Sequence, residues 1–276
     1  MSKKTKTSPS SRVHLGRAQS AAVLAARSVG SLLKKNLNAA KRANEVTQHD
    51  IKLELDVRSQ QLIEKSLHAA FPAIPLLGEE GSAGDMEAEY RWVVDPIDGT
   101  VNFTYGIPHA CVSIALQQRR PSGHAAEYQD GYETLLGVIY DPFCDELWTA
   151  QLGTPARLNG KSIRVSARPK LEEAIVCLGF AKTQESLKRT LPYFNQLVPR
   201  VRKVRIMGSA ALALTYVATG RFDAYIESGI RLWDVAAGGL IVQRAGGEYW
   251  HQPIPGEHAY RLIASNGLLR RSLRVP

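Results

Sequence analysis

Carboxylates stand at the ends of several apolar stretches of this sequence. The run 92–94 (Trp-Val-Val) leads into Asp95, and Asp98 follows three residues later. Comparable acids, beside other apolar or glycine-containing stretches, are Glu79, Asp234 and Asp50. Carboxylate oxygens, backbone carbonyls and water are the ligands that hard divalent cations such as Mg²⁺ prefer. The pattern therefore favours a divalent-cation site. A plain turn at 95–99 is the alternative, because Asp-Pro and Asp-Gly are common turn pairs.

Gly99 and Thr100 directly follow the second acid and suit an anion. A helix or turn that starts here leaves backbone N–H groups without intrahelical partners, and such groups can point at a phosphate. Glycine lets the backbone approach that phosphate closely. Carboxylates packed together would also raise one another's pKa values unless a cation lay among them. A cation cluster beside free N–H groups favours phosphoryl transfer to water as the reaction.

The first part of the chain predicts two helices that could support these residues. Apolar periodicity predicts a helix over 14–35, whose inward face is formed by Leu15, Ala18, Ala22, Val29 and Leu33. A second helix is predicted over 56–71, capped by Asp56, with Leu62, Ile63 and Leu67 inward. The polar residues 36–50 between them predict a loop.

The remainder of the chain is predicted to form mainly strands at first and, after about residue 170, strands that alternate with helices. Strands are expected at 90–95, 111–118, 135–142 and 146–152, and Asn159-Gly160 predicts a hairpin turn. After about residue 170, strands at 174–180, 201–207 and 221–227 alternate with helices at 184–198, 209–220 and 234–247. Ser209 and Asp234 open the last two helices, and the small residues 236–239 predict close helix packing.

This pattern divides the chain into three parts. We interpret residues 1–13 as a basic flexible tail and 14–170 as an α+β part that binds metal and phosphate. Residues 171–276 are interpreted as an α/β part that completes the active site.

Composition narrows the class of protein. The 276 residues are 44% hydrophobic, with no apolar run of membrane-helix length and no signal peptide, so we expect a soluble cytoplasmic protein. The three cysteines form no CxxC pair, a pattern that favours free thiols over a zinc site or a disulfide framework. A net charge of +9 and an acid-free start leave open a solvated tail, a nucleic-acid-binding tail or a transit peptide. Basic runs at 119–124, 197–206 and 268–275 are candidate binding patches, although such runs are usually solvated.

Four segments resemble one protein family. "WVVDPIDGTVNF" (92–103) and "LWDVAAGGLIVQRAGG" (232–247) resemble the two signatures of the inositol monophosphatase family. "LLGEEG" (76–81) is similar to its Gly-Glu-Glu element, and 135–163 is similar to the hairpin region of bacterial members. The similarity extends over residues 14–267. It implies an α/β fold, the αβαβα layered sandwich of the sugar-phosphatase type.

The resemblance also implies a site, position by position. The implied metal ligands are Glu79, Asp95, the Ile97 carbonyl, Asp98 and Asp234, for two Mg²⁺ ions and a weak third, with Asp98 bridging two of them. The implied catalytic residues are Asp50, Thr100 and Glu79. The implied substrate-binding residues are Asp98, Gly99, Thr100, Gly208, Ser209, Ala210, Glu227 and Asp234. The family has Val-Thr where Lys52-Leu53 stand here, which makes the alignment around Asp50 the least secure.

The implied reaction is in-line hydrolysis of a phosphomonoester by a Mg²⁺-activated water, without a phospho-enzyme. Thr100 would accept a hydrogen bond from that water and donate one to Asp50. Glu227 favours a small polyol monophosphate, inositol 1-phosphate above all. Histidinol phosphate, fructose 1,6-bisphosphate and adenosine 3′,5′-bisphosphate are the alternatives among relatives.

The resemblance further implies a homodimer and inhibition by Li⁺. The competing class is a binding protein, because some bacterial members of the family also attach to transcription machinery and the chain is rich in Lys and Arg. The complete acid set favours catalysis, since a protein that only binds RNA or a polymerase needs none of those carboxylates.

Overall fold

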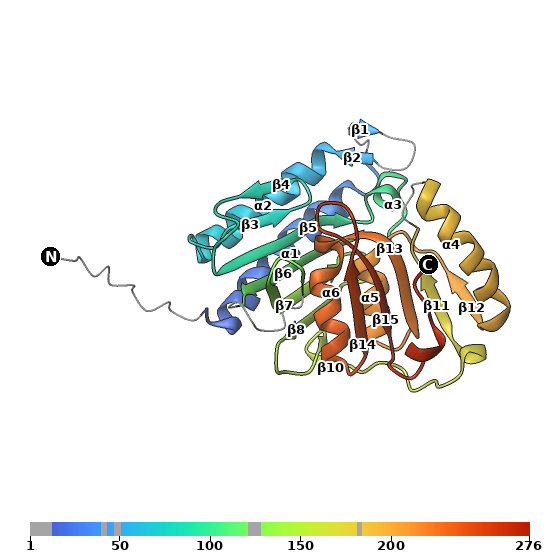
Figure 1. The fold of residues 1–276 in the computed structure, drawn as a ribbon. Coiled ribbons are helices and arrows are strands. Elements are labelled where there is room, and N and C mark those ends of the chain that lie inside the picture. The colour runs from blue at the N-terminus through green and yellow to red at the C-terminus, as the bar shows by residue number, and fades with distance from the viewer. Residues whose placement is uncertain (1–12, 40–42, 47–50, 121–127, 181–183) are drawn as a thin grey trace.

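The protein is a five-layer sandwich in a computed structural model that describes residues 13–39, 43–46, 51–120, 128–180 and 184–276 (Figure 1). Helices α1 (Leu15–Asn36) and α2 (Glu54–Ala70) cover the outer face of the first sheet. Helices α5 (Ala210–Ala218) and α6 (Leu232–Arg244) lie between the two sheets, and α4 (Gln184–Leu197) covers the outer face of the second. The order αβαβα confirms the fold that the family resemblance implies.

The two sheets divide the strands by their place in the chain. The eight-stranded sheet has the order β10-β9-β8-β7-β6-β5-β3-β4. Its strands are β3 (Leu76–Gly78), β4 (Gly81–Ala83), β5 (Tyr90–Asp98), β6 (Cys111–Arg119), β7 (Tyr132–Asp141), β8 (Glu146–Gln151), β9 (Arg157–Leu158) and β10 (Lys161–Ser162). The five-stranded sheet has the order β12-β11-β13-β15-β14. Its strands are β11 (Ile175–Leu178), β12 (Lys203–Arg205), β13 (Ala224–Arg231), β14 (Glu248–Pro253) and β15 (Ala259–Ser265).

Small elements complete the fold. A two-stranded ribbon pairs β1 (Ala43–Val46) with β2 (Ile51–Leu53). The short helix α3 (Thr100–Thr104) follows β5, and 3₁₀ turns are η1 (Leu171–Glu173), η2 (Val198–Arg200) and η3 (Arg270–Ser272). Within the described part of the chain, no helix is both long and apolar enough to cross a membrane.

Covered sheets explain the apolar strands of the sequence. In β5, Trp92 and Val94 pack toward α1 and α2, whereas Val93 packs toward α5 and α6. In β13, Tyr225 faces the middle helix layer and Ile226 faces the α4 layer. Successive strand residues point to opposite faces, so a strand that is buried on both faces is apolar at nearly every position.

Small residues bring α6 close to its neighbours. A Cβ at Gly238 would stand 2.5 Å from Leu214 Cδ1 of α5, and a Cβ at Gly137 of β7 would stand 2.6 Å from the Ala237 carbonyl oxygen. Closely packed atoms do not tolerate such distances. The prediction that residues 236–239 serve helix packing is confirmed. These contacts hold the middle of α6 against α5 and against the first sheet.

Two predicted helix starts are wrong by two residues. Helices α2 and α6 begin at Glu54 and Leu232, so Asp56 and Asp234 are third residues of their helices. Their carboxylates accept hydrogen bonds from the N–H groups of Leu53 (2.6 Å) and Arg231 (3.0 Å). An acid in the first turn accepts a hydrogen bond from a backbone N–H that has no partner within the helix, much as an N-cap does. For this reason the sequence pattern places each helix start at the acid, although the helix begins two residues earlier.

Two smaller predictions also differ from the structure. Leu62 is 37% exposed, because the inward stripe of α2 runs through Ile63 and Leu67. The predicted loop 36–50 contains β1, whose polar sequence lacks the apolar alternation that usually indicates a strand.

An aromatic cluster joins the turn at Tyr128 to the second sheet. The His251 ring of β14 stacks on Tyr128 with centroids 4.7 Å apart, and Tyr260 meets it edge-on at 5.5 Å. Burial lowers the pKa of His251 from 6.5 to about 4, since the charged imidazolium loses its hydration there. The folded protein therefore holds this ring neutral at pH values where the unfolded chain protonates it.

This difference predicts a pH dependence of stability. Between pH 6.5 and about 4 the unfolded state binds more protons at His251, so the stability that the neutral ring provides is lost as the pH falls through this window. His251→Phe keeps the stacking and removes the titration. We expect the free energy of unfolding, measured in urea at pH 7.5 and pH 5.0, to fall by about 1–2 kcal/mol less in this variant than in the wild type. His68→Phe, at an exposed position of α2, controls for the loss of a histidine; an equal fall in wild type and His251→Phe contradicts the prediction.

Candidate metal centre

A bulge in β5 places Asp95 and Asp98 on one face of the first sheet. Asp95 pairs with Ser113 and Asp98 pairs with Cys111, so three steps on β5 match two on β6. In a regular strand, residues three apart point to opposite faces. The extra residue of the bulge restores the same face for both acids. Ile97, between them, packs toward α1 and α2 instead.

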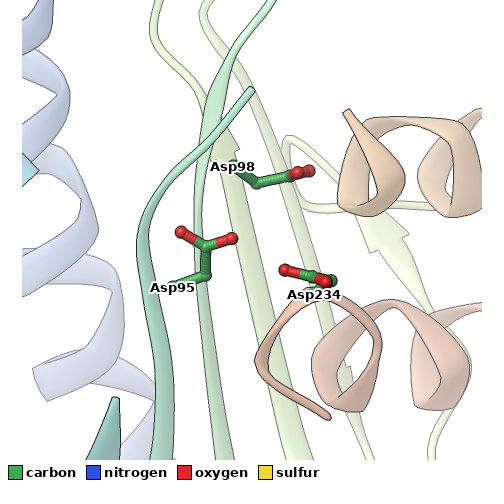
Figure 2. A group of neighbouring side chains, drawn as sticks. All are labelled: Asp95, Asp98 and Asp234. Carbon is green, nitrogen blue, oxygen red and sulfur yellow. The ribbon is translucent and has the colours of Figure 1, made fainter. Parts of the chain in front are cut away.

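Asp234 reaches the same place from α6. One carboxylate oxygen from each of Asp95, Asp98 and Asp234 lies within 4.8 Å of the others, and Figure 2 shows the three side chains converging. Asp95 and Asp98 are buried, and Asp234 is half-buried. The bulge and the first turn of α6 thus join acids that are far apart in the sequence.

Hydrogen bonds fix Asp98 to the start of α5. Its Oδ2 accepts hydrogen bonds from Ser209 Oγ at 2.5 Å and from the Ala211 N–H at 2.6 Å. The Ala210 N–H donates to Oδ1 at 3.2 Å, and the Cys111 thiol lies 3.7 Å from Oδ2. Both lone pairs of Oδ2 are therefore engaged, and Oδ1 is the atom of Asp98 that remains for a cation.

The electrostatics of the cluster favour a bound cation. The pKa of Asp95 is raised well above its usual value by burial and then by the charges of Glu79, Asp98 and Asp234. Burial, Asp98 and Glu79 likewise raise the pKa of Asp234. Burial raises the pKa of Asp98 too, although Ser209 and Ala211 oppose that shift. A set of oxygen donors that repel one another in this way fits a hard divalent cation, which removes the repulsion.

The residues between and beside these acids lie around the cluster. Glu79 follows β3, is half-buried, and its N–H donates to the Val94 carbonyl at 3.1 Å. Gly99 has φ of 98°, and a Cβ there would stand 2.8 Å from the His109 carbonyl oxygen, so this position requires glycine. Thr100 begins α3, and its hydroxyl donates to the Ile97 carbonyl at 2.8 Å. A hydroxyl has one proton, so this bond excludes a simultaneous donation to Asp50.

The predicted substrate residues come from the second part of the chain. Gly208, Ser209 and Ala210 form the entry to α5, where Ser209 is the N-cap and its Oγ accepts from the Leu212 N–H at 3.3 Å. Glu227 stands on β13 and accepts a hydrogen bond from Tyr225. Asp50 lies outside the described residues, as does most of the predicted tail.

Glu227 depends on a glycine opposite it. A Cβ at Gly179 would stand 1.6 Å from a carboxylate oxygen of Glu227, so no other residue at 179 leaves that side chain in place. Tyr225, which donates to Glu227, has its pKa raised by burial and then by the charges of Glu227 and, more weakly, Asp98. The Tyr225 hydroxyl is therefore bound to the predicted polyol acid and also experiences the charge of Asp98.

Asn102 is a residue of the site that the sequence interpretation missed. Its amide donates to the His109 carbonyl at 2.9 Å and to the Met207 carbonyl at 2.8 Å. It thus ties the segment after α3 to the loop that leads into α5. An asparagine inside a helix is a poor helix former that often bonds to nearby backbone, and this signal could have singled it out.

Carboxylates from two layers of this sandwich, the first sheet and the middle helices, converge in a group that could hold a divalent cation. The chain belongs to the inositol monophosphatase family, whose family model matches residues 15–266. Membership supports a phosphatase function and a dependence on metal, which the acid cluster fits.

Similar proteins carry two kinds of name. The chain is 40% identical over 234 residues to Nus factor SuhB of Pseudomonas aeruginosa, covering 82% of each chain. It is 37% identical over 233 residues to inositol monophosphatase 1 of Solanum lycopersicum, covering 82% of this chain and 81% of that one. Among solved structures, suhB of Bartonella henselae has a TM-score of 0.82 at 31% identity, covering 92% of this chain and 96% of that one. The Thermotoga maritima IMPase has a TM-score of 0.79 at 31% identity, with coverages of 92% and 94%.

The cluster predicts opposite effects of one substitution with and without metal. Asp95→Asn removes the central buried charge, so in EDTA we expect the variant to melt at a higher temperature than the wild type, by several degrees. Addition of Mg²⁺ should raise the melting temperature of the wild type and leave the variant nearly unchanged. Asp85→Asn, an exposed change of equal charge, is the control. A variant that responds to Mg²⁺ as the wild type does would exclude Asp95 from the metal centre.

Proposed function

We propose that this protein is a Mg²⁺-dependent phosphomonoesterase and that its substrate is a small polyol monophosphate, inositol 1-phosphate first. The convergence of Asp95, Asp98 and Asp234 beside Gly99 and Thr100 carries the proposal, because it sets a divalent-cation site against backbone N–H groups that suit a phosphate. Family membership and relatives named inositol monophosphatase support it.

The donor atoms suggest how two cations would share the acids. Glu79, Asp95 and the Ile97 carbonyl would hold one, and Asp95, Asp98 and Asp234 would hold the other. The resemblance assigned the bridge to Asp98, but Asp98 Oδ2 is engaged by Ser209 and Ala211. Asp95, whose Oδ1 accepts one hydrogen bond, from the Ile97 N–H at 2.9 Å, is the better bridge. A third cation beside Asp50 stays a prediction.

When bound, the cations supply positive charge that lowers the pKa of a water and stabilises the oxygen of the leaving alcohol. The chain's own residues do the positioning. The N–H groups at Gly99 and Thr100 bind phosphate oxygens, and the α5 entry keeps Asp98 fixed during the reaction. The Ile97 carbonyl has two lone pairs, so it would serve as a ligand while still accepting from the Thr100 hydroxyl, whose own oxygen would accept a hydrogen bond from the attacking water.

Glu227 supports the choice of a polyol. A half-buried carboxylate offers acceptors to vicinal hydroxyl groups, and the hydrogen bond from Tyr225 holds it in place. Histidinol phosphate, fructose 1,6-bisphosphate and adenosine 3′,5′-bisphosphate are the other substrates to be compared. A homodimer, inhibition by Li⁺ and a cytoplasmic location stay predictions from the resemblance and the composition.

A phosphate-release assay over these four substrates, with Mg²⁺ and with EDTA, tests the proposal. We expect inositol 1-phosphate to give the highest kcat/KM and EDTA to abolish release. Asp95→Asn should lower kcat at least about 10³-fold at saturating Mg²⁺, because transition-state charge loses a few kcal/mol of stabilisation. Asp234→Asn keeps an oxygen for the Arg231 N–H and should still lower kcat, which separates the metal role from the helix-start role.

Glu227→Gln should raise KM for inositol 1-phosphate roughly tenfold, since its carboxylate would bind hydroxyls in the ground state. The same change should leave KM for a phosphate ester without neighbouring hydroxyls unaltered. Wild-type turnover by Asp95→Asn, or no Mg²⁺-dependent release from any of the four substrates, would refute the phosphatase proposal.

A second candidate role is association with transcription machinery, which the relatives named Nus factor SuhB favour. Capture of RNA polymerase by the tagged full chain tests it. Capture that Asp95→Asn leaves intact, in the absence of phosphate release, would favour this role over catalysis.

A further inference from the structure

A basic pocket lies on the outer face of the second sheet, between the C-terminal segment and strands β14 and β15. Its volume is about 260 Å³, and Trp250, Ile263, Arg261, Arg270 and Arg274 contribute to its lining. Ile263 belongs to the apolar cluster under α4, whereas its strand neighbour Leu262 faces the middle layer with α6. The pocket is therefore on the opposite side of the sheet from the α6 layer, which carries Asp234.

In the part of the chain that the structure describes, an acid pairs with only one of the three arginines that line the pocket, Arg270. Arg270 lies over the Trp250 ring at 5.2 Å from the centroid, and its Nε lies 3.3 Å from Glu248. Arg261 donates from Nε and Nη2 to the uncharged Gln252 side chain, at 3.1 and 2.5 Å. Among the described residues, neither Arg261 nor Arg274 forms a salt bridge. Two uncompensated positive charges thus flank an indole.

The positive surface continues from the pocket toward the edge of the second sheet. The Arg274 N–H donates to the Tyr193 hydroxyl of α4 at 3.3 Å. The charges of Arg200 and Arg274 both lower the pKa of this phenol against the effect of burial, so both arginines lie near it. Exposed basic residues follow along the edge strand β12 and its approach, namely Arg202, Lys203 and Arg205. Figure 1 shows the C-terminus on the same side of the molecule as α4 and β12.

From this geometry we propose that the pocket binds nucleotide units of a single-stranded nucleic acid. The Arg270 guanidinium that lies over the Trp250 indole presents a planar, positively charged surface on which a base of any sequence can stack. Arginine also pairs with phosphate through two N–H groups at once. The volume is below that of ordinary small-ligand sites, so it takes one base rather than a whole metabolite. The flanking phosphates contact Arg261 and Arg274, and the strand continues past Tyr193 to Arg200.

The aromatic component decides between nucleic acid and an acidic protein. Carboxylates of an acidic peptide would satisfy the arginines but would offer no planar group to stack on the Arg270–Trp250 pair. This inference is independent of the phosphatase proposal, because no residue of the pocket belongs to the metal centre.

Fluorescence anisotropy of a labelled 12-nucleotide oligouridylate with the full-length protein tests the inference, over 50–300 mM NaCl. Arg261→Gln with Arg274→Gln should weaken binding at least tenfold and reduce the slope of log K against log[salt] by about 1.4, the value for two lost phosphate contacts on a single strand. Trp250→Leu should weaken binding roughly tenfold and leave that slope unchanged, and Trp250→Phe should restore most of the affinity.

The matched control is Lys34→Gln with Lys35→Gln, which removes the same charge from the exposed end of α1 on the other side of the molecule. We expect less than a twofold effect from it. The melting temperature and its rise with Mg²⁺ show that each variant is folded. A control variant that loses as much affinity as the pocket variant, or a wild type that does not bind at 50 mM NaCl, overturns the proposal.

Two competitors distinguish a nucleic-acid strand from a free nucleotide and from an acidic peptide as the ligand. Uridine 5′-monophosphate should displace the oligomer only at much higher concentration, and hexaglutamate should not displace it at matched charge. If the mononucleotide displaced the oligomer equally well, the ligand would be a free nucleotide and the proposal of a single strand would be wrong. If hexaglutamate displaced it equally well, nucleotide recognition would be refuted.

Discussion

The main constraint on this structure is that the fold brings together carboxylates that repel one another. The bulge in β5 brings Asp95 and Asp98 to one face, and the packing of α6 brings Asp234 to them. Burial raises the pKa values of all three acids, and like charge raises those of Asp95 and Asp234 further, so in the absence of a cation this cluster destabilises the protein. The surrounding elements resist that repulsion through contacts elsewhere. Helix α6 cannot move away from the cluster, because it is closely packed where Gly238 meets Leu214 and where Ala237 meets Gly137.

Much of the fold and of the acid set could be predicted from the sequence. Strands such as β5 and β6 are long and apolar on both faces, and α1 has a strict 3.6-residue period, so their existence follows from local pattern. The two signatures led to the layered sandwich and to Asp95, Asp98 and Asp234, although the roles of these acids stay proposals. Helix starts were displaced because an acid inside the first turn gives the same signal as a cap.

Other features depend on partners that are distant in the chain. The engagement of Asp98 Oδ2 by Ser209 and Ala211 joins residues more than one hundred positions apart. Asn102 shows the same limit, since the Met207 carbonyl that it binds lies 105 positions away. Neither set of hydrogen bonds leaves a pattern in the local sequence, because each depends on how the two sheets pack against the middle helices. The β1–β2 ribbon escaped prediction for a different reason, because strands of four and three residues are too short to show an alternating pattern.

The hydrogen bonds of Asp98 have a consequence for assembly. Glu79, Asp95 and Asp98 belong to the first sheet and its edge, whereas Asp234, Ser209 and Ala211 belong to the helices that follow. A nascent chain that has emerged only as far as residue 170 would carry a partial set of acids with nothing to hold Asp98 in register. Ser209, Ala211 and Asp234 all follow residue 170, so the carboxylate cluster can form only after the later part of the chain has been synthesised and has packed against the first sheet.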